Sequence, residues 1–178
     1  MAQLAIPITT SDHTMGSDDP VVTLIEYGDY QCPYCAAAQP VVQQILARHR
    51  SRLLFAFRHF PLTEIHPNAG PAAEAAEFAA SHGLFWEMHE AIFANQPRLS
   101  LPTLIELAVG LNLSGIALRD ALATGRFAPK VLADFMGGVS SGVKGTPTFF
   151  INGAQFENAG GIASLIPAID HVIQAAEA

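Results

Sequence analysis

Two cysteines stand three residues apart near the start of the chain, in the run Cys32-Pro33-Tyr34-Cys35. They are the only cysteines among 178 residues, too few for the disulfide framework of a small secreted domain. Two thiols at this spacing can close a disulfide within one helical turn, which is typical of redox motifs. The chemistry that these residues allow is thiol–disulfide exchange.

Exchange needs a thiolate as the nucleophile, and therefore a thiol with a pKa below the usual value of about 8.5. We expect Cys32 to meet this need because it precedes a helix starting at Pro33, where unpaired backbone N–H groups and the helix dipole stabilise negative charge. Pro33 suits a first helical turn and, with Tyr34, should tune the stability of the reduced pair. Cys35, one turn further on, should be more buried and would resolve a mixed disulfide on Cys32.

The segments that flank the motif predict a βαβ unit. Residues 21–25 form a continuous apolar, β-branched run that is typical of a buried strand. Apolar residues then recur at helical spacing up to about residue 49, and a second strand is expected at 53–58. Such a unit implies parallel strands with a right-handed crossover.

The rest of the chain predicts a helical insertion followed by a hairpin and a helix. Ala, Glu and Leu dominate residues 67–142, which predicts several helices, with a break at Gly137-Gly138. Apolar residues 148–151 predict a strand, and Asn152-Gly153 a hairpin turn into a strand at 154–157. A helix is expected at 162–175.

This order of elements predicts an α/β fold in which two distant segments share one sheet. A loop of about 75 residues is too long for a compact domain, so residues 67–142 should form an inserted helical domain. Residues 18–66 and 143–178 should rejoin as a discontinuous domain that holds the sheet. Residues 1–17 are expected to be a polar, loosely held N-terminal arm.

Three separated features resemble one known family. They are the Cys-x-x-Cys pair at a helix start, the run Gly145-Thr146-Pro147-Thr148 before an apolar strand, and Glu26 six residues before Cys32. Together they resemble the DsbA-like branch of the thioredoxin superfamily, thiol–disulfide oxidoreductases in which a helical domain interrupts the thioredoxin fold (βαβ–ββα). Segments 57–62, 65–67 and 85–89 are similar to stretches that recur in a bacterial DsbA-like subgroup.

The resemblance implies roles for residues outside the cysteine pair. It implies a cis Pro147 that leaves backbone groups around Thr146 able to pair with an extended substrate, although a Thr-Pro bond taken alone would be trans. It also implies that Glu26 is buried. Burial would raise the pKa of its carboxyl and let it relay a proton to or from Cys35; the alternative is a solvated residue at a strand end. Strongly oxidising members carry histidine where Tyr34 stands, so the direction of exchange stays open.

Composition excludes several classes of function. The chain has 9 Lys and Arg against 16 Asp and Glu, a net charge of −7, which argues against nucleic acid as a partner. No apolar run approaches the roughly 18 residues of a membrane span, so membrane insertion is not expected. The pairs His59/His66 and His82/His89 are each seven apart and do not fit a zinc site. We expect no metal and no cofactor, and His89 should be a packed residue.

The sequence therefore predicts an enzyme that exchanges disulfides with protein or small thiol substrates and with a redox partner of the thioredoxin or glutathione type. Two alternatives stay open: a non-catalytic protein-binding module of thioredoxin fold, and a glutathione-linked transferase or isomerase on a DsbA-like scaffold. The first 14 residues do not resemble a secretory signal, which favours a cytoplasmic location. There a reductase or isomerase is expected, whereas a periplasmic form whose signal had been removed would oxidise.

Overall fold

The computed structural model describes residues 2–157 and 159–176. The chain divides into two compact units, of which the sheet unit comprises Met1–Gly28, Ala37–Arg58 and Gly137–Ala178. The helical unit comprises Asp29–Ala36 and His59–Met136, so the cysteine pair belongs to it. The domain boundaries predicted from the sequence, at residues 66/67 and 142/143, differ from this division and stay predictions.

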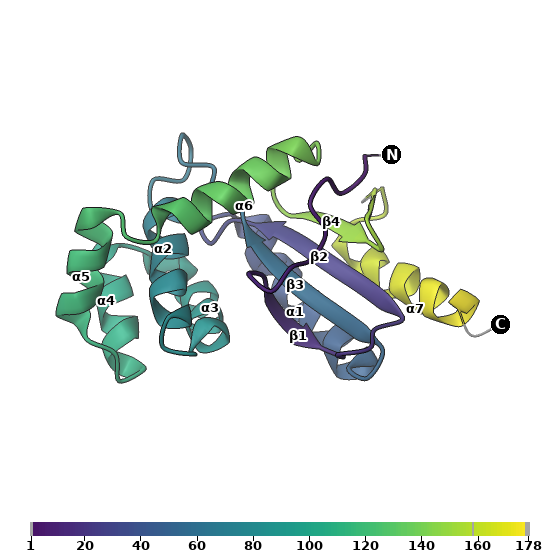
Figure 1. Ribbon diagram of the computed structural model, residues 1–178, viewed down its shortest axis with the longest axis horizontal. Helices are drawn as coiled ribbons and strands as arrows, with labels where there is room; N and C mark the ends of the chain where they lie inside the picture. The colour runs from purple at the N-terminus through teal and green to yellow at the C-terminus, as the bar shows by residue number, and fades with distance from the viewer. Residues whose placement is uncertain (1, 158, 177–178) are drawn as a thin grey trace. The chain divides into compact units, whose positions relative to one another are not determined.

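Five strands form one sheet in the order β1-β3-β2-β4-β5 (Figure 1). They are β1 His13–Gly16, β2 Val22–Gly28, β3 Leu53–His59, β4 Thr148–Ile151 and β5 Ala154–Gln155. Antiparallel pairing joins β1 to β3, β2 to β4 and β4 to β5. Six of the seven residues of β2 are buried, because this strand lies in the middle of the sheet, which explains its continuous apolar run.

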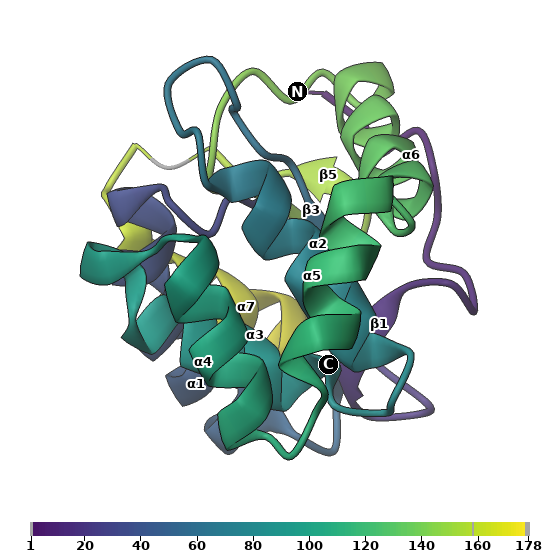
Figure 2. The ribbon, with the colours of Figure 1, turned by 90° about the vertical axis from the view of Figure 1, so that its left-hand side faces the viewer.

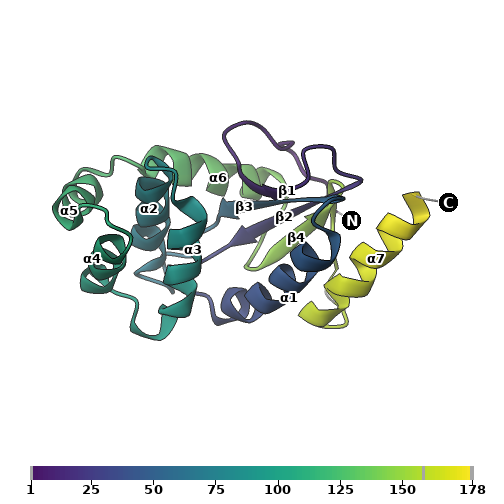
Figure 3. The same ribbon diagram turned by 90° about the horizontal axis from the view of Figure 1, so that it is seen from below.

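Two helices cover one face of the sheet in the sheet unit (Figures 1 and 3). Helix α1 spans Pro33–His49, and α7 spans Leu165–Ala176 after a short 3-10 turn at Ile162–Ser164. The buried residues of α7 recur every fourth position, as a helix packed along one stripe requires. At the far end of α1, His49 Nε2 lies 2.6 Å from Asp170 Oδ1 of α7.

The helical unit contains most of the remaining helices, and the four α-helices between residues 69 and 124 pack against one another (Figure 2). They are α2 Ala69–Ala80, α3 Phe85–Ala94, the 3-10 turn η1 Gln96–Arg98, α4 Leu101–Gly110, α5 Gly115–Thr124 and α6 Ala128–Ser140. Serine side chains cap α4 and α5 by accepting a backbone N–H, as the capping rules predict. No described helix has the length and apolar character needed to cross a membrane.

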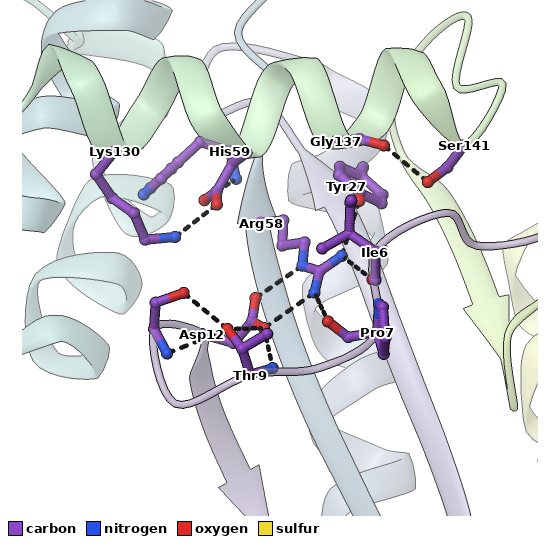
Figure 4. Close-up of polar contacts among 12 residues, drawn as sticks. Ile6, Pro7, Thr9, Asp12, Tyr27, Arg58, His59, Lys130, Gly137 and Ser141 are labelled. Atoms are coloured by element: carbon purple, nitrogen blue, oxygen red, sulfur yellow. Dashed lines mark hydrogen bonds and ion pairs between the residues drawn. The ribbon is translucent and has the colours of Figure 1, made fainter.

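The N-terminal segment is held more firmly than the sequence predicts. Residues 13–16 form β1, and Arg58 of β3 holds the residues before it (Figure 4). Arg58 donates from Nε and Nη2 to the two carboxylate oxygens of Asp12, at 2.7 and 2.9 Å. It also donates to the carbonyl oxygens of Ile6 and Pro7, at 2.8 and 2.9 Å, and to the hydroxyl of Tyr27, at 2.9 Å. The predicted loosely held arm is therefore wrong for this segment.

Arg58 is charged although it is only 3% exposed. Burial by itself lowers the pKa of Arg58, but the hydrogen bonds to Asp12 and Tyr27 outweigh this effect and raise it above its ordinary value. A buried cation needs such partners because an uncompensated charge in the interior is costly. The pairing between Arg58 and Asp12 explains why a polar N-terminal segment packs on the sheet.

Two further predictions are wrong, one in α6 and one in the hairpin. The expected break at Gly137-Gly138 is absent, since α6 continues through both glycines to Ser140. A Cβ added at Gly137 would lie 3.5 Å from Ile6 Cγ1 and from the Tyr27 hydroxyl, so the helix passes close to these groups there. The second strand of the hairpin, β5, covers only Ala154–Gln155 instead of 154–157.

Candidate active site

The cysteine pair lies at the junction of β2 and α1. Strand β2 ends at Gly28 and α1 begins at Pro33, so Cys32 directly precedes the first helical residue. Cys35 is fully buried and Cys32 is 3% exposed, which is the predicted order. Both carry thiols. Tyr34 between them is 73% exposed, so it presents its ring to solvent beside two buried sulfurs.

A four-residue turn, 29–32, carries the chain from the strand to Cys32. The Cys32 N–H donates to the Asp29 carbonyl at 3.1 Å, and the Gln31 N–H donates to Asp29 Oδ1 at 2.7 Å. This second bond is an Asx turn, in which an aspartate side chain replaces a backbone acceptor. The Asp29 N–H points to Cys35 and lies 3.4 Å from its Sγ. One residue thus organises the turn and contacts the second sulfur.

The carboxylate of Asp29 also holds the segment that follows β3. Its Oδ2 accepts hydrogen bonds from the Leu62 N–H and from Nδ1 of His66, both at 2.8 Å. The Asp29 side chain is completely buried, and the His66 side chain is 17% exposed. Three donors therefore compensate for burial of this carboxylate.

Two glutamines fix the other polar groups of the turn. Gln31 Oε1 accepts the Asn68 N–H at 2.7 Å, just before α2. Gln96 of η1 donates from Nε2 to the carbonyl oxygens of Tyr30 and Cys32, at 2.8 and 2.9 Å. The turn is irregular in backbone, but three of its amides are bonded within residues 29–35 and two of its carbonyls accept from the Gln96 side chain.

An aromatic cluster anchors the turn through Tyr30. The Tyr30 hydroxyl lies 3.0 Å from Nδ1 of His89, and its ring is 4.9 Å from that of Phe93. His89 is buried at 3% exposure and its ring also contacts those of Phe85 and Trp86. The prediction that His89 is a packed residue is confirmed.

The other predicted site residues lie in the sheet unit. Glu26 is completely buried in β2, paired in register with Phe149 of β4, so the solvated alternative is wrong. The Thr146–Pro147 peptide bond is cis, as the resemblance implies. A cavity of about 630 Å³ lies beside this bond, and Lys144 and Gln155 contribute to its lining.

The structure therefore brings Cys32, Pro33, Tyr34 and Cys35 together in one unit, and places Glu26 with Thr146 and Pro147 in the other. Sequence reasoning did not identify Asp29 or Gln96. The signal for Asp29 was an Asx-turn residue between a strand end and the cysteine motif. Gln96 gave no signal, because its contact with the turn joins residues 64 apart in the chain.

Comparisons with known proteins agree with this architecture. Residues 9–171 match the sequence model of a family described as thioredoxin. The chain is similar to oxidised BdbD from Bacillus subtilis, with 23% identity, 99% of each chain covered and a TM-score of 0.86. It is also similar to α-DsbA1 from Wolbachia pipientis, with 21% identity, 97% of this chain and 96% of that chain covered, and a TM-score of 0.82. At such identities the likeness shows the fold.

Curated relatives come from longer proteins. The Na(+)/H(+) antiporter NhaA 1 of Salinispora arenicola is 40% identical over 167 residues, which are 93% of this chain and 26% of that protein. NhaA 3 of Salinispora tropica matches with the same identity and coverage. The chain spans about a quarter of the length of these relatives. The family match over 9–171 shows that the chain belongs to the thioredoxin family, and its fold is similar to that of BdbD and α-DsbA1.

Proposed function

We propose that this protein is a thiol–disulfide oxidoreductase in which Cys32 is the attacking cysteine and Cys35 the resolving one. The DsbA-like fold supports this class of reaction in general. The observation that carries the assignment is the position of Cys32 directly before α1, with the buried Cys35 thiol one turn further on. Helix N-termini stabilise a thiolate, and only the thiolate attacks.

The reaction needs only the two cysteines and a partner. In the reducing direction, the Cys32 thiolate attacks a substrate disulfide, breaks its S–S bond and releases one substrate thiolate. Cys35 then loses its proton and attacks Cys32, which releases the second substrate thiolate and leaves a Cys32–Cys35 disulfide. A protein dithiol of the thioredoxin type, oxidised to its own disulfide, or two glutathione molecules, which leave as glutathione disulfide, would return the pair to thiols. In the oxidising direction the same steps run in reverse.

We assign the remaining predicted residues supporting roles in this scheme. Thr146 and the cis Pro147 line a cavity that suits an extended segment of a substrate protein, with Lys144 as its cationic side chain. Glu26 is the buried acid that would exchange a proton during resolution by Cys35. The neutral Tyr34 leaves Cys32 without the cation that a histidine would place there. This supports reduction or isomerisation over oxidation.

The equilibrium reduction potential of the pair tests the proposal. The protein is equilibrated with glutathione buffers, and the oxidised fraction is read by mass spectrometry after acid quenching. We expect a value close to about −270 mV, as for thioredoxin. A value close to about −120 mV would make the protein a disulfide donor.

The antiporter relatives favour one further candidate, a module that binds a membrane transporter without catalysing exchange. Cys32→Ser separates the two functions. If exchange is lost while binding to a candidate partner persists, the enzyme is supported. If the wild-type pair forms no disulfide in any buffer, the module is supported instead.

A further inference from the structure

We propose that Asp29 is a positioning residue for the exchange reaction: its carboxylate fixes the turn 29–32 so that its own N–H is aimed at Cys35 Sγ. The inference rests on the proposed function and adds a residue that controls its second step. In that step Cys35 must become a thiolate and attack Cys32. A backbone N–H directed at the sulfur stabilises the negative charge that develops there.

The carboxylate is placed to control the direction of this N–H. Oδ1 holds the turn from inside through the Gln31 N–H, and Oδ2 holds it from outside through Leu62 and His66. The side chain is completely buried, so water does not substitute for these donors. Backbone and side chain of Asp29 share one Cα, so a backbone rotation that turns the N–H away from Cys35 would also draw the carboxylate away from its three donors.

Asp29→Asn is the discriminating variant because it keeps the size of the side chain and one acceptor oxygen. If the amide oxygen accepts from Gln31, the amide NH₂ faces the Leu62 N–H, and two donors oppose each other. The clamp from the 62–66 segment is then lost. The variant also removes a negative charge near Cys35, which by itself would favour the Cys35 thiolate and speed its attack. Positioning and charge therefore predict opposite effects.

The experiment follows both steps with glutathione disulfide as the oxidant. The Cys32 thiolate of the reduced protein attacks glutathione disulfide and releases one glutathione thiolate, forming a mixed disulfide. Cys35 then attacks Cys32, its proton passes to solvent, and the second glutathione leaves. Acid quenching and mass spectrometry count the reduced, mixed and internally bonded forms over time. Each step thus has its own rate.

We expect Asp29→Asn to leave the first rate unchanged within about twofold and to slow the second about tenfold, so that the mixed disulfide accumulates. Asp134→Asn is the matched control. Asp134 is also a buried aspartate of the helical unit, but its carboxylate accepts the His59 N–H at 3.2 Å and pairs with Lys130, both of which lie outside the turn. It should leave both rates unchanged.

Further variants keep the test decisive. His66→Ala removes one donor to Oδ2 at a partly exposed position and should slow the second step about threefold. If Asp29→Asn does not fold by near-UV circular dichroism, His66→Ala alone decides. An unchanged or faster second step in the folded variants overturns the inference. A wild-type protein that forms neither disulfide species overturns the proposed function instead.

Discussion

Arg58 in the sheet unit and Asp29 in the helical unit are both buried charged residues held by a dense set of hydrogen bonds, and the two charges have different uses. In the sheet unit, Arg58 donates to Asp12, to two backbone carbonyls and to Tyr27 (Figure 4). All these acceptors are structural, and the result is a fixed N-terminal segment. In the helical unit, Asp29 accepts three hydrogen bonds and directs its own N–H to a reactive sulfur.

The comparison teaches that satisfying a buried charge can serve stability or reactivity, according to where the hydrogen bonds end. Both charges need full satisfaction, because a buried ion without partners costs several kcal/mol. The hydrogen bonds of Arg58 end only on groups that hold the N-terminal segment and the sheet. Around Asp29 they lead to Cys35, so a disturbance there should be visible in exchange rates as well as in stability.

The largest expected effect is on the sheet unit. Arg58→Met keeps much of the apolar stem but leaves the carboxylate of Asp12 buried without its cation, because the Asp12 side chain is 3% exposed. We expect a loss of about 3–5 kcal/mol in the free energy of unfolding, measured by urea denaturation at pH 7. Arg98→Met is the matched control. Arg98 forms a similar two-pronged pair with Glu106, which lowers the pKa of that carboxyl, but both groups are exposed.

The control should change stability little, because solvent screens an exposed pair. If Arg58→Met is as mild as Arg98→Met, the N-terminal segment is not fixed by Arg58, and the contrast between the two networks fails.

A smaller effect is expected at Tyr30, an uncharged residue of the turn 29–32. Tyr30→Phe removes the hydroxyl that lies 3.0 Å from Nδ1 of His89, in a buried site. The loss should cost about 1–2 kcal/mol in unfolding free energy, because His89 then lacks this partner. The ring contacts remain, so the rate of resolution by Cys35 should change less than in Asp29→Asn. If Tyr30→Phe slows resolution by Cys35 more than Asp29→Asn does, then Tyr30, and not Asp29, positions the turn.

The smallest effect concerns a carboxyl group that accepts fewer hydrogen bonds than the carboxylate of Asp29. Glu74 of α2 lines an apolar cavity of about 280 Å³ with Val131, Leu132 and Phe135. Burial raises the pKa of Glu74, and the N–H groups of Phe127 and Ala128 only partly oppose this. The folded protein therefore binds a proton on Glu74 more tightly than the unfolded chain does.

It follows that the contribution of Glu74 to stability is complete below its unfolded pKa and is lost as the pH rises through the folded value. Glu74→Gln should leave stability unchanged near pH 4 and raise it by less than about 1 kcal/mol at pH 7. Urea denaturation at the two pH values measures this difference. Equal changes at both pH values would mean that the carboxyl is as well solvated as an exposed one.

Local patterns predicted the elements that position the site, and long-range contacts account for what they missed. The strand at 148–151 and the helix start at Pro33 follow from residues that are adjacent in the chain. The fixed N-terminal segment depends on Arg58, 46 residues away from Asp12. Asp29 likewise meets Leu62 and His66 more than 30 residues later. The sequence around a polar residue does not show which distant donor will form a hydrogen bond with it.

Met136 illustrates the same limit for apolar residues. It falls at helical spacing in an apolar stretch, which predicts a core position, yet it is 52% exposed on α6. Helical periodicity shows which residues share one face of a helix, but it does not show which element packs on that face. The same spacing predicts burial of the phenylalanines Phe78, Phe85 and Phe93, and all three are buried.

The engagement of the turn 29–32 has a consequence for hydrogen exchange. Irregular segments usually exchange their amide protons quickly, because local opening exposes them at little cost. Here the amides of Gln31 and Cys32 are bonded within the turn, and Gln96 holds two of its carbonyls. The loop that carries the nucleophile should therefore be protected like the helices around it and open together with them, so that Cys32 keeps a fixed setting between successive encounters with substrate.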